Sequence, residues 1–457
     1  MRRKVLVCGL DSAPGEIVFN QKARLPTLSR LMEKGLYGNL RSCDPPITIP
    51  AWMVMMTGQD PGKLGLYGFR HRQGYSYKDL WIATSQSIKE KTIWDFLGKA
   101  GGSSCVVSVP PTYPPKPLAG HLISCFITPD ASKNYTYPAS LKSELENLFS
   151  AYLFDVEFRT DDKENLLEGI YQMTKRRFAV MKYLMTQKPW DFFMFVEIGV
   201  DRVQHGFWKY MDREHHLYSP GNPYESVIID YYRFLDKQIG ELIDLADPET
   251  VVLVVSDHGA KRMKGAFCIN EWLIEQGLLK VKEKPSQPTS LEKVEVDWPK
   301  TKAWAWGGYY ARVFLNVEGR EPQGIIPADD YEQERQKLIE KLTAIKGPGG
   351  ESWATRVIIP SEHFPVVNGD YPDLMVYFDD LYWRSAGTLG YSNPYLLEND
   401  TGPDDAVHSQ EGIYILYDPL SPRSGRHDAD ILDIAPTVLS FLDLPVPQDM
   451  KGKIIYA

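Results

Sequence analysis

Apolar runs that lead into an acidic residue recur along this chain, and they constrain its fold more than any other feature. Three such runs are Lys4 to Leu10, Phe192 to Ile198 and Val251 to Val255. They are closely followed by Asp11, Asp201 and Asp257, respectively. A strand buried on both faces of a parallel sheet is expected to be an unbroken apolar run of this kind. We therefore expect parallel strands with acidic side chains just past their carboxyl ends.

Segments with a helical period lie between these strands. They include Leu25 to Lys34, Pro50 to Thr57, Lys163 to Gln187 and Tyr224 to Leu245. Strands and helices that alternate along the whole chain predict an α/β fold with a mainly parallel sheet. Lys280 to Lys302 is polar with scattered prolines, and Asp380 to Val407 has little periodicity, so we expect loops or insertions there.

One hydroxyl group is distinctive in the stretch from Asp44 to Gly58. Thr48 follows a proline pair and precedes Pro50, where an apolar helix is expected to begin, because proline is favoured at the first helical position. Thr48 would then lie at or near the N-cap of the helix, close to free backbone N–H groups, which attract phosphate. A threonine that only caps a helix has the same local pattern, so the other polar residues decide its role.

The polar residues near the strand ends are those of a divalent metal site. They are Asp11, Thr48, Asp201, His205, Asp257, His258 and His408. In open α/β sheets ligands bind outside the carboxyl ends of the strands, so most of these residues can meet in one crevice. Three imidazoles and three carboxylates, with the threonine, offer each of two ions three or four ligands, which suits zinc or manganese. Taken singly, the Asp201–His205 spacing also fits a surface ion pair, and His408 also fits an ordinary loop histidine.

Composition limits the class of binding partner and the cellular compartment that we expect. The 51 basic and 60 acidic residues give a net charge of −9, and no basic run suggests a nucleic-acid surface, so we expect small-molecule partners. Five widely spaced cysteines argue for reduced thiols and a cytoplasmic location. Nowhere do about 18 apolar residues occur together, so no membrane span is predicted. The oligomeric state is left open.

Taken together, the motifs resemble those of the alkaline phosphatase superfamily. They are Gly9-Leu-Asp11, Thr48-Ile-Pro50, Asp201-x-x-x-His205, Asp257-His258-Gly259, His408 with Glu411-Gly412, and Asp433-Ile-Ala-Pro436-Thr437. They occur in the family's order and extend over nearly the whole chain. The likeness is greatest to the branch of type I phosphodiesterases, nucleotide pyrophosphatases and predicted phosphohydrolases or phosphomutases.

This resemblance implies a fold and a division of the ligands. The fold would be an alkaline-phosphatase-like three-layer sandwich, with a mainly parallel central sheet, helices on both faces and insertions. We expect residues 1–457 to form a single domain, with 275–350 as an insertion or cap subdomain. One metal ion would be held by Asp201, His205 and His408. The second would be held by Asp11, Asp257 and His258 together with the oxygen of Thr48.

Departures from the family patterns refine the function. Sulfatases of the superfamily use a Cys-x-Pro-x-Arg motif, whereas Thr48-Ile-Pro50-Ala-Trp52 lacks the arginine, so sulfate ester cleavage is not expected. Nucleotide pyrophosphatases commonly have an asparagine in the segment that matches residues 66–72, and this chain has none there. Arg70 or Arg72 is a candidate for that phosphate contact, because arginine binds phosphate in a bidentate way. A solvated basic loop is the alternative.

The expected function is metal-dependent hydrolysis of a phosphate ester through a phospho-Thr48 intermediate. Phosphodiester cleavage is the first choice and phosphomonoester cleavage the second. A phosphomutase, which is an isomerase, would use the same metals and the same threonine. A non-catalytic metal-binding protein is a third hypothesis, which the intact ligand set disfavours.

Overall fold

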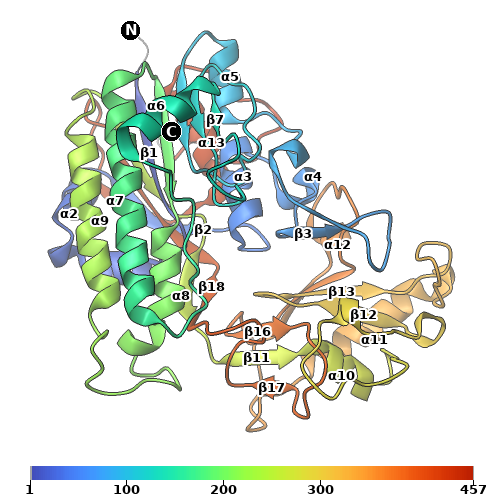
Figure 1. Cartoon of the computed structure of the whole chain (residues 1–457). Coiled ribbons are helices and arrows are strands. Elements are labelled where there is room, and N and C mark those ends of the chain that lie inside the picture. Colours follow the sequence, from blue (N-terminus) through green and yellow to red (C-terminus); the bar gives the residue numbers. More distant parts are fainter. Residues whose placement is uncertain (1–2, 456–457) are drawn as a thin grey trace.

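The computed structural model of the chain describes residues 3–455, and these form two lobes (Figure 1). The larger lobe is built on one central sheet. The smaller lobe contains most of the chain between residues 265 and 396. Among the described residues, no helix is long and apolar enough to cross a membrane.

The central sheet is mainly parallel, which confirms the predicted fold class. Its strands follow the order β20-β2-β19-β9-β1-β8-β5-β6-β7, and β21 also pairs with β2. Only β19 and β7 run against their neighbours. The strands are β1 (Val5–Leu10), β2 (Leu36–Arg41), β5 (Ser104–Val107), β6 (Gly120–Ile123), β7 (Thr136–Tyr137), β8 (Phe192–Glu197), β9 (Val251–Val255), β19 (Glu411–Tyr417), β20 (Gly425–Arg426) and β21 (Ala429–Asp430).

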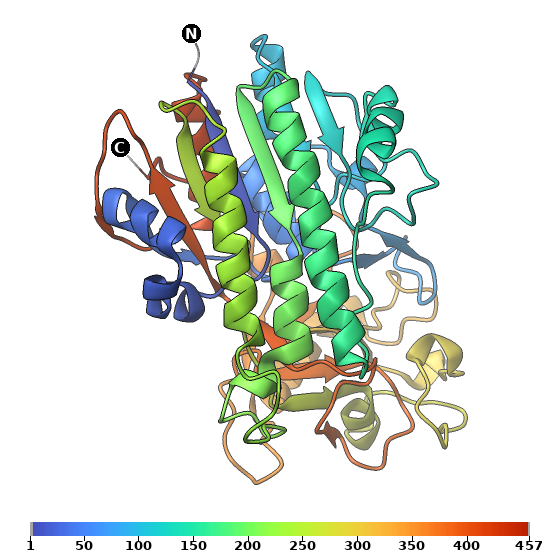
Figure 2. The same ribbon diagram turned by 60° about the vertical axis from the view of Figure 1, so that its left-hand side comes forward.

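Helices cover both faces of this sheet and complete the three layers. One face carries α2 (Pro26–Lys34), α7 (Lys163–Gln187), α8 (Gly199–Met211) and α9 (Val227–Ile243), and Figure 2 shows the last three side by side. The other face carries α3 (Thr48–Thr57), α5 (Ile93–Lys99) and α13 (Ile434–Phe441). The central strands β1, β8 and β9, which lie between the two layers, are buried at every position.

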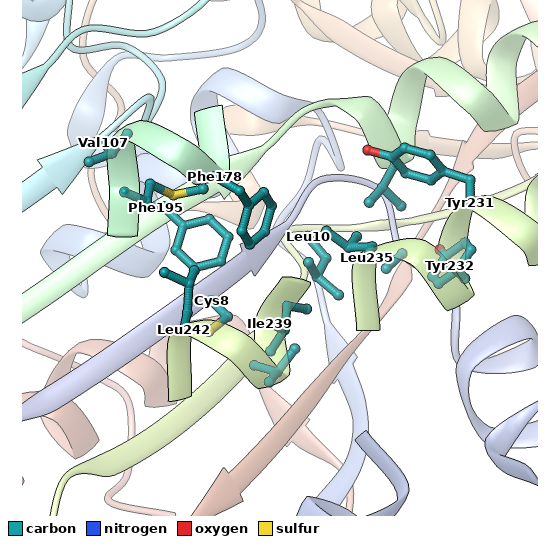
Figure 3. Close-up of a cluster of buried hydrophobic side chains, with 14 of the residues drawn as sticks. Cys8, Leu10, Val107, Phe178, Phe195, Tyr231, Tyr232, Leu235, Ile239 and Leu242 are labelled. Carbon is teal, nitrogen blue, oxygen red and sulfur yellow. The ribbon is translucent and has the colours of Figure 1, made fainter. Parts of the chain in front are cut away.

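Alternation along β1 explains why an unbroken apolar run is needed. Leu6, Cys8 and Leu10 face the layer of α7 and α9, whereas Val5 and Val7 face the layer of α3. Figure 3 shows Cys8 and Leu10 among side chains from these helices. Because both faces are covered, every position of the strand has to be apolar until the strand ends.

The smaller lobe packs short sheets against short helices around its own apolar core. One sheet has the order β12-β13-β15-β14 and a second has the order β16-β11-β17. The elements are β11 (Gly265–Cys268), α10 (Ile269–Glu275), β12 (Ala303–Trp306), β13 (Ala311–Leu315), α11 (Tyr331–Thr343), β14 (Arg356–Ile358), α12 (Pro360–His363), β15 (Leu374–Tyr377), β16 (Trp383–Ala386) and β17 (Tyr395–Leu396). These sheets take strands from inside and from outside the predicted 275–350 segment.

The remaining elements are short. They are α1 (Gly15–Asn20), α4 (Pro61–Leu64), β3 (Arg70–Arg72), β4 (Leu80–Ile82), α6 (Ser140–Phe149), β10 (Gly259–Arg262) and β18 (Ala406–Ser409). Short 3₁₀ turns occur at Lys22–Arg24, Ser85–Ser87, Leu291–Lys293, Trp298–Lys300, Ala328–Asp330 and Ile431–Asp433.

The prediction of an unbroken loop over Asp380 to Val407 is wrong, because β16, β17 and part of β18 lie within this segment. Strands of two to four residues are too short to show a period.

The helix that follows Asp44 also begins earlier than predicted. Thr48 is the first residue of α3, and Ile47 occupies the capping position. Proline at the third helical position is tolerated, because the N–H groups of the first turn have no intrahelical partners. Thr48 therefore lies within the first turn of the helix and is not its cap.

Candidate active site

Sheet order explains why residues far apart in the sequence meet. Strands β9, β1 and β8 are neighbours and run parallel, so their carboxyl ends lie at one edge of the sheet. Asp11 directly follows β1, and Asp257 and His258 follow β9. Asp201 and His205 lie on α8, which begins just after β8, and their spacing of four places both side chains on one helical face.

Thr48 and His408 reach the same edge by other routes. Strand β19 runs antiparallel to β9, so the residues that precede β19 lie where the parallel strands end. His408 is on β18, immediately before β19, where it pairs with Ala260 of β10. Strand β2 is antiparallel to β19 and thus runs in the same direction as β9. The chain that leaves β2 leads to Thr48 at the start of α3.

The two predicted ligand groups are both present as compact buried clusters. In each group the candidate ligand atoms lie within 4.8 Å of one another. In the first group, Asp201 Oδ1 lies 3.1 Å from His205 Nε2 and 3.8 Å from His408 Nε2. In the second, His258 Nε2 lies 3.2 Å from Asp257 Oδ2 and 4.0 Å from Asp11 Oδ1. Thr48 Oγ1 lies 3.4 Å from His258 Nε2, so the hydroxyl adjoins the second group.

One oxygen of each carboxylate lacks a hydrogen-bond partner among the described residues. These buried atoms are Asp11 Oδ1, Asp201 Oδ1 and Asp257 Oδ2, which are also the atoms that face the histidines. A buried carboxylate oxygen without a partner is costly. Divalent cations would satisfy all three oxygens, so the donor set fits two metal ions that accept nitrogen and oxygen ligands.

The other oxygen of each carboxylate is fixed by the protein. Trp52 Nε1 donates to Asp11 Oδ2 at 2.7 Å. The Ser12 amide donates to Asp257 Oδ1 at 3.1 Å, and Arg202 donates to Asp201 Oδ2 at 2.6 Å. Contacts of this kind orient ligand side chains before a metal binds. Trp52 and Arg202 were not predicted from the sequence as parts of the site.

The histidines are oriented through their Nδ1 atoms. Nδ1 of His408 lies 2.8 Å from the carbonyl oxygen of Pro46, and Nδ1 of His258 lies 3.1 Å from that of Gly259. A carbonyl only accepts, so Nδ1 carries the proton and Nε2 keeps its lone pair. Burial lowers the pKa of His258 to about 4, and burial with the nearby His258 lowers the pKa of His408 well below its usual value. Both imidazoles are therefore neutral at pH 7, as metal ligands have to be.

Crowded carboxylates are the main electrostatic feature of the site. Burial, followed by the charge of Asp201, raises the pKa of Asp11 well above its usual value. Burial and the charge of Asp11 raise the pKa of Asp257 in the same way. Burial also acts to raise the pKa of Asp201, but His205 and Arg202 hold it far below the usual range. Two positive ions at this edge would oppose the repulsion that raises the first two values.

Asp404 and Tyr309 are two contacts of the site that sequence reasoning missed or left undecided. Asp404 is buried, and its Oδ1 lies 2.6 Å from His205 Nδ1, while its Oδ2 accepts from Arg384 at 2.7 Å. The Tyr309 hydroxyl lies 3.2 Å from His205 Nε2, and its ring stacks on His408 with centroids 3.7 Å apart. From its aromatic sequence neighbours Trp306 and Tyr310, Tyr309 fits either an aromatic wall for a ligand or a core cluster. Asp404 lies in a segment without periodicity, so the sequence gave no sign that its carboxylate would be buried beside His205.

The two predicted phosphate-binding arginines lie in different surroundings. Arg70 is exposed and lines a cavity beside the site. Arg72 is buried, forms an ion pair with Glu321 at 3.1 Å, and lies 4.4 Å from the centre of the Phe314 ring. Because the charge of Arg72 is already paired and enclosed, we interpret it as a structural residue and not as a phosphate ligand.

Replacing Arg72 by methionine tests this interpretation. Breaking a buried ion pair by removing one partner costs several kcal/mol, and Glu321 keeps a second partner in Arg320, so we expect the free energy of unfolding to fall by about 3 kcal/mol. We expect KM to stay within about twofold of the wild-type value, which corresponds to a change of less than about 1 kcal/mol in the free energy of binding. Urea denaturation and steady-state kinetics measure the two effects. Arg70→Met is the matched control and should leave stability within about 0.5 kcal/mol. Unchanged stability with a raised KM would contradict the structural role of Arg72.

The fold and the residues at the carboxyl edge of its sheet define an alkaline-phosphatase-like phosphoesterase. The site lies where the parallel strands end, as ligand sites do in open α/β sheets. The chain belongs to the type I phosphodiesterase / nucleotide pyrophosphatase family, whose model matches residues 5–404. Phosphoester hydrolysis is accordingly its class of reaction. No curated protein is similar enough to this chain to count as a match.

Solved structures share the fold at low sequence identity. Human ectonucleotide pyrophosphatase / phosphodiesterase 5 is 13% identical with a TM-score of 0.58, and the alignment covers 99% of this chain and 97% of that one. An inactive threonine-to-alanine variant of the murine protein, solved in complex with AMP, is 14% identical with a TM-score of 0.55. That alignment covers 98% of this chain and 97% of the murine chain. These likenesses extend over both lobes.

Proposed function

We propose that this protein hydrolyses a phosphodiester or a nucleotide pyrophosphate bond through a phosphothreonine intermediate on Thr48. We further propose that it needs two divalent ions, with zinc as the first assignment and manganese as the second. The observation that carries the proposal is the position of the Thr48 hydroxyl, 3.4 Å from His258 Nε2, at an edge of the sheet where three buried carboxylate oxygens lack hydrogen-bond partners among the described residues. A hydroxyl that only stabilised the helix would not need that surrounding.

The ligands are divided as the family resemblance implies. Asp201, His205 and His408 would hold one ion, and Asp11, Asp257 and His258 would hold the other together with Thr48. When bound, such ions supply positive charge that lowers the pKa of a threonine hydroxyl and stabilises negative charge on a phosphoryl group. A threonine hydroxyl needs that help, because it is barely ionised at neutral pH.

The chain itself positions the reacting groups. Thr48 is 4% exposed and stands on the first turn of α3, so its oxygen is held with little freedom. The first-turn N–H groups of a helix lack intrahelical partners and are suited to a phosphate oxygen. Thr48 Oγ1 would lose its proton and form the new bond to phosphorus while the bond to the leaving alcohol or phosphate breaks and that leaving group takes up a proton. Water would then cleave the phosphothreonine and restore the hydroxyl. The murine relative that binds AMP supports this proposal, because its threonine-to-alanine variant is inactive.

A small phosphate ester is the proposed partner, and the cytoplasm is the proposed location. All five cysteines are unpaired, and four of them are buried. Thiols that stay free are typical of a reducing compartment. The redox state of these thiols in the purified protein can be measured by alkylation under denaturing conditions.

A panel of nitrophenyl esters tests the reaction class. With zinc or manganese present, we expect kcat/KM for bis(4-nitrophenyl) phosphate to exceed that for 4-nitrophenyl phosphate by roughly tenfold or more, about 1.4 kcal/mol of transition-state stabilisation. The reverse order would make the protein a phosphomonoesterase. Inactivity on every ester, with metal bound, would favour the phosphomutase or the metal-binding protein. A chain that stays metal-free and active would contradict the two-ion proposal.

A further inference from the structure

A cavity of about 460 Å³ adjoins the candidate active site, between the larger lobe and the smaller one. Ile47, the neighbour of Thr48, lines it, as do Tyr309 and Arg202, which contact ligands of the first group. Strands β12 and β13 and the loop before β3 form another part of its wall. A substituent attached to a phosphate at Thr48 therefore has room in this cavity.

Arginine is the most frequent charged residue in the lining. The arginines are Arg70, Arg159, Arg202, Arg312 and Arg384. Three of them are paired with acids. Arg202 bonds Asp155 and Asp201, while Arg159 and Arg384 both bond Asp404. Their charges are therefore balanced without a ligand.

Arg312 and Arg70 have no such partner. Neither forms an ion pair with a carboxylate in the part of the chain that the structure describes, residues 3–455. Arg312 donates to the backbone carbonyl of Arg70, and its guanidinium lies 5.2 Å from the centre of the Trp306 ring. Burial lowers the pKa of Arg312, and the charge of Arg70 acts in the same direction, while only the Tyr310 hydroxyl opposes them. The guanidinium is thus held in place next to the cavity with its charge unbalanced.

The acids of the cavity do not supply this balance. Glu292 and Asp400 both line it, and neither is within ion-pair distance of an arginine among residues 3–455. Asp400 accepts a hydrogen bond from Thr388 at 2.7 Å, and Glu292 is exposed to solvent. An anionic ligand would give Arg312 the counter-charge that the protein leaves out, since guanidinium binds phosphate and carboxylate groups in a bidentate way.

We propose that Arg312 and Arg70 form a subsite for a second anionic group of the substrate. The substrate is then a phosphate ester whose organic part carries a further phosphate or carboxylate, a statement that rests on the proposed hydrolysis at Thr48. The ring of Trp306 makes a cation–π contact with the guanidinium of Arg312, which helps to hold it beside the cavity. Phosphate and carboxylate groups both carry the negative charge that this contact needs. The experiment below distinguishes between them.

Three matched diesters test the subsite. They are the 4-nitrophenyl esters of propyl, 2-carboxyethyl and 2-phosphonoethyl phosphate, which differ in the charge at the end of the alkyl chain. The wild type is expected to prefer a charged ester over the propyl ester by about tenfold or more in kcat/KM, the effect of one charge-assisted contact. The better of the carboxyl and phosphono esters identifies the source of the charge. Equal rates on all three esters would overturn the subsite.

Variants locate the effect on the two arginines. Arg312→Gln and Arg70→Gln should each lower kcat/KM for the charged esters by about tenfold and change it for the propyl ester by less than twofold. Arg233→Gln, an exposed position on α9 outside the cavity, is the matched control and should change none of them. An equal loss on all three esters would mean that the arginines act on the site in general, which overturns the proposal.

Binding without turnover separates this inference from the proposed function. Calorimetric titration of the metal-loaded protein with propylphosphonate and with 3-phosphonopropionate compares one anionic group with two. If no ester is hydrolysed, but 3-phosphonopropionate binds more tightly and Arg312→Gln removes the difference, the hydrolysis proposal fails and the subsite stands. If the wild type binds both phosphonates equally and shows no preference for the phosphono ester, the subsite is refuted.

Discussion

Turnover in the Thr48→Ala variant is expected to fall by about 10⁴-fold or more, as when a nucleophile is removed from other covalent enzymes. The change removes the only oxygen that the proposal places in the new bond to phosphorus. The α3 helix should remain intact, because alanine is the best helix former and Thr48 is not the cap. Six side chains would still be available to the metals, so we expect two ions per chain by elemental analysis.

Thr48→Ser is the matched control for this variant. It restores the hydroxyl and removes one buried methyl group, which costs about 1 kcal/mol of stability. We expect it to recover most of the lost activity. Full turnover in Thr48→Ala would exclude a phosphothreonine, and a loss of both ions would mean that the threonine acts mainly as a ligand. Trapping of radioactive phosphate on the wild type, and not on the alanine variant, would identify the intermediate directly.

Asp257→Asn is expected to remove one metal ion and to lower turnover by about 10³-fold or more, since a missing ion takes away several kcal/mol of charge stabilisation. Asp257 Oδ1 can still accept from the Ser12 amide after the change, so the loop after β9 should keep its place. The atom that is lost as an anionic ligand is Oδ2, which has no other partner among the described residues. Elemental analysis should give one ion per chain in place of two.

Asp404→Asn is expected to weaken metal binding less than Asp257→Asn does. Asp404 contacts His205 and is not itself in either ligand group, and losses of such supporting contacts typically weaken metal affinity by about 10- to 100-fold. Asp230→Asn, on the exposed side of α9, should leave affinity unchanged. Because zinc stabilises the folded protein that binds it, added zinc should raise the melting temperature of the wild type and of Asp230→Asn. The rise should be smaller for Asp257→Asn and Asp404→Asn. Equal metal content in all four proteins would contradict the assigned ligands.

The large elements of the main lobe were predictable from local patterns. The apolar run at Val251–Val255 is β9 without change, and the run from Phe192 differs from β8 only at its end. The helical period over Lys163–Gln187 gave the bounds of α7. Strands buried on two faces and long helices on a sheet each impose a period on their own residues, so the sequence contains the information directly.

The smaller lobe and the wall of the cavity were much less predictable. Strands β16 and β17 have four and two residues and lie in a segment that was predicted to be a loop. Arg72 and Arg70 are two residues apart in one basic segment, yet one is buried against Glu321 and the other is exposed. Adjacent strand residues point to opposite sides, and residues two apart share a side only while the strand stays regular, so local sequence did not separate their roles.

By itself the sequence determined the α/β class, the threonine ahead of an apolar helix, and the acids and histidines placed just beyond apolar strands. Charged residues seldom follow buried strands without a partner, so these positions were informative on their own. Tertiary structure alone decided that β9, β1 and β8 lie side by side and that β19 runs against them. It also brought Arg312 next to Arg70, 242 positions away. Strand order and lobe packing depend on contacts between residues distant in the chain, and no local period encodes those contacts.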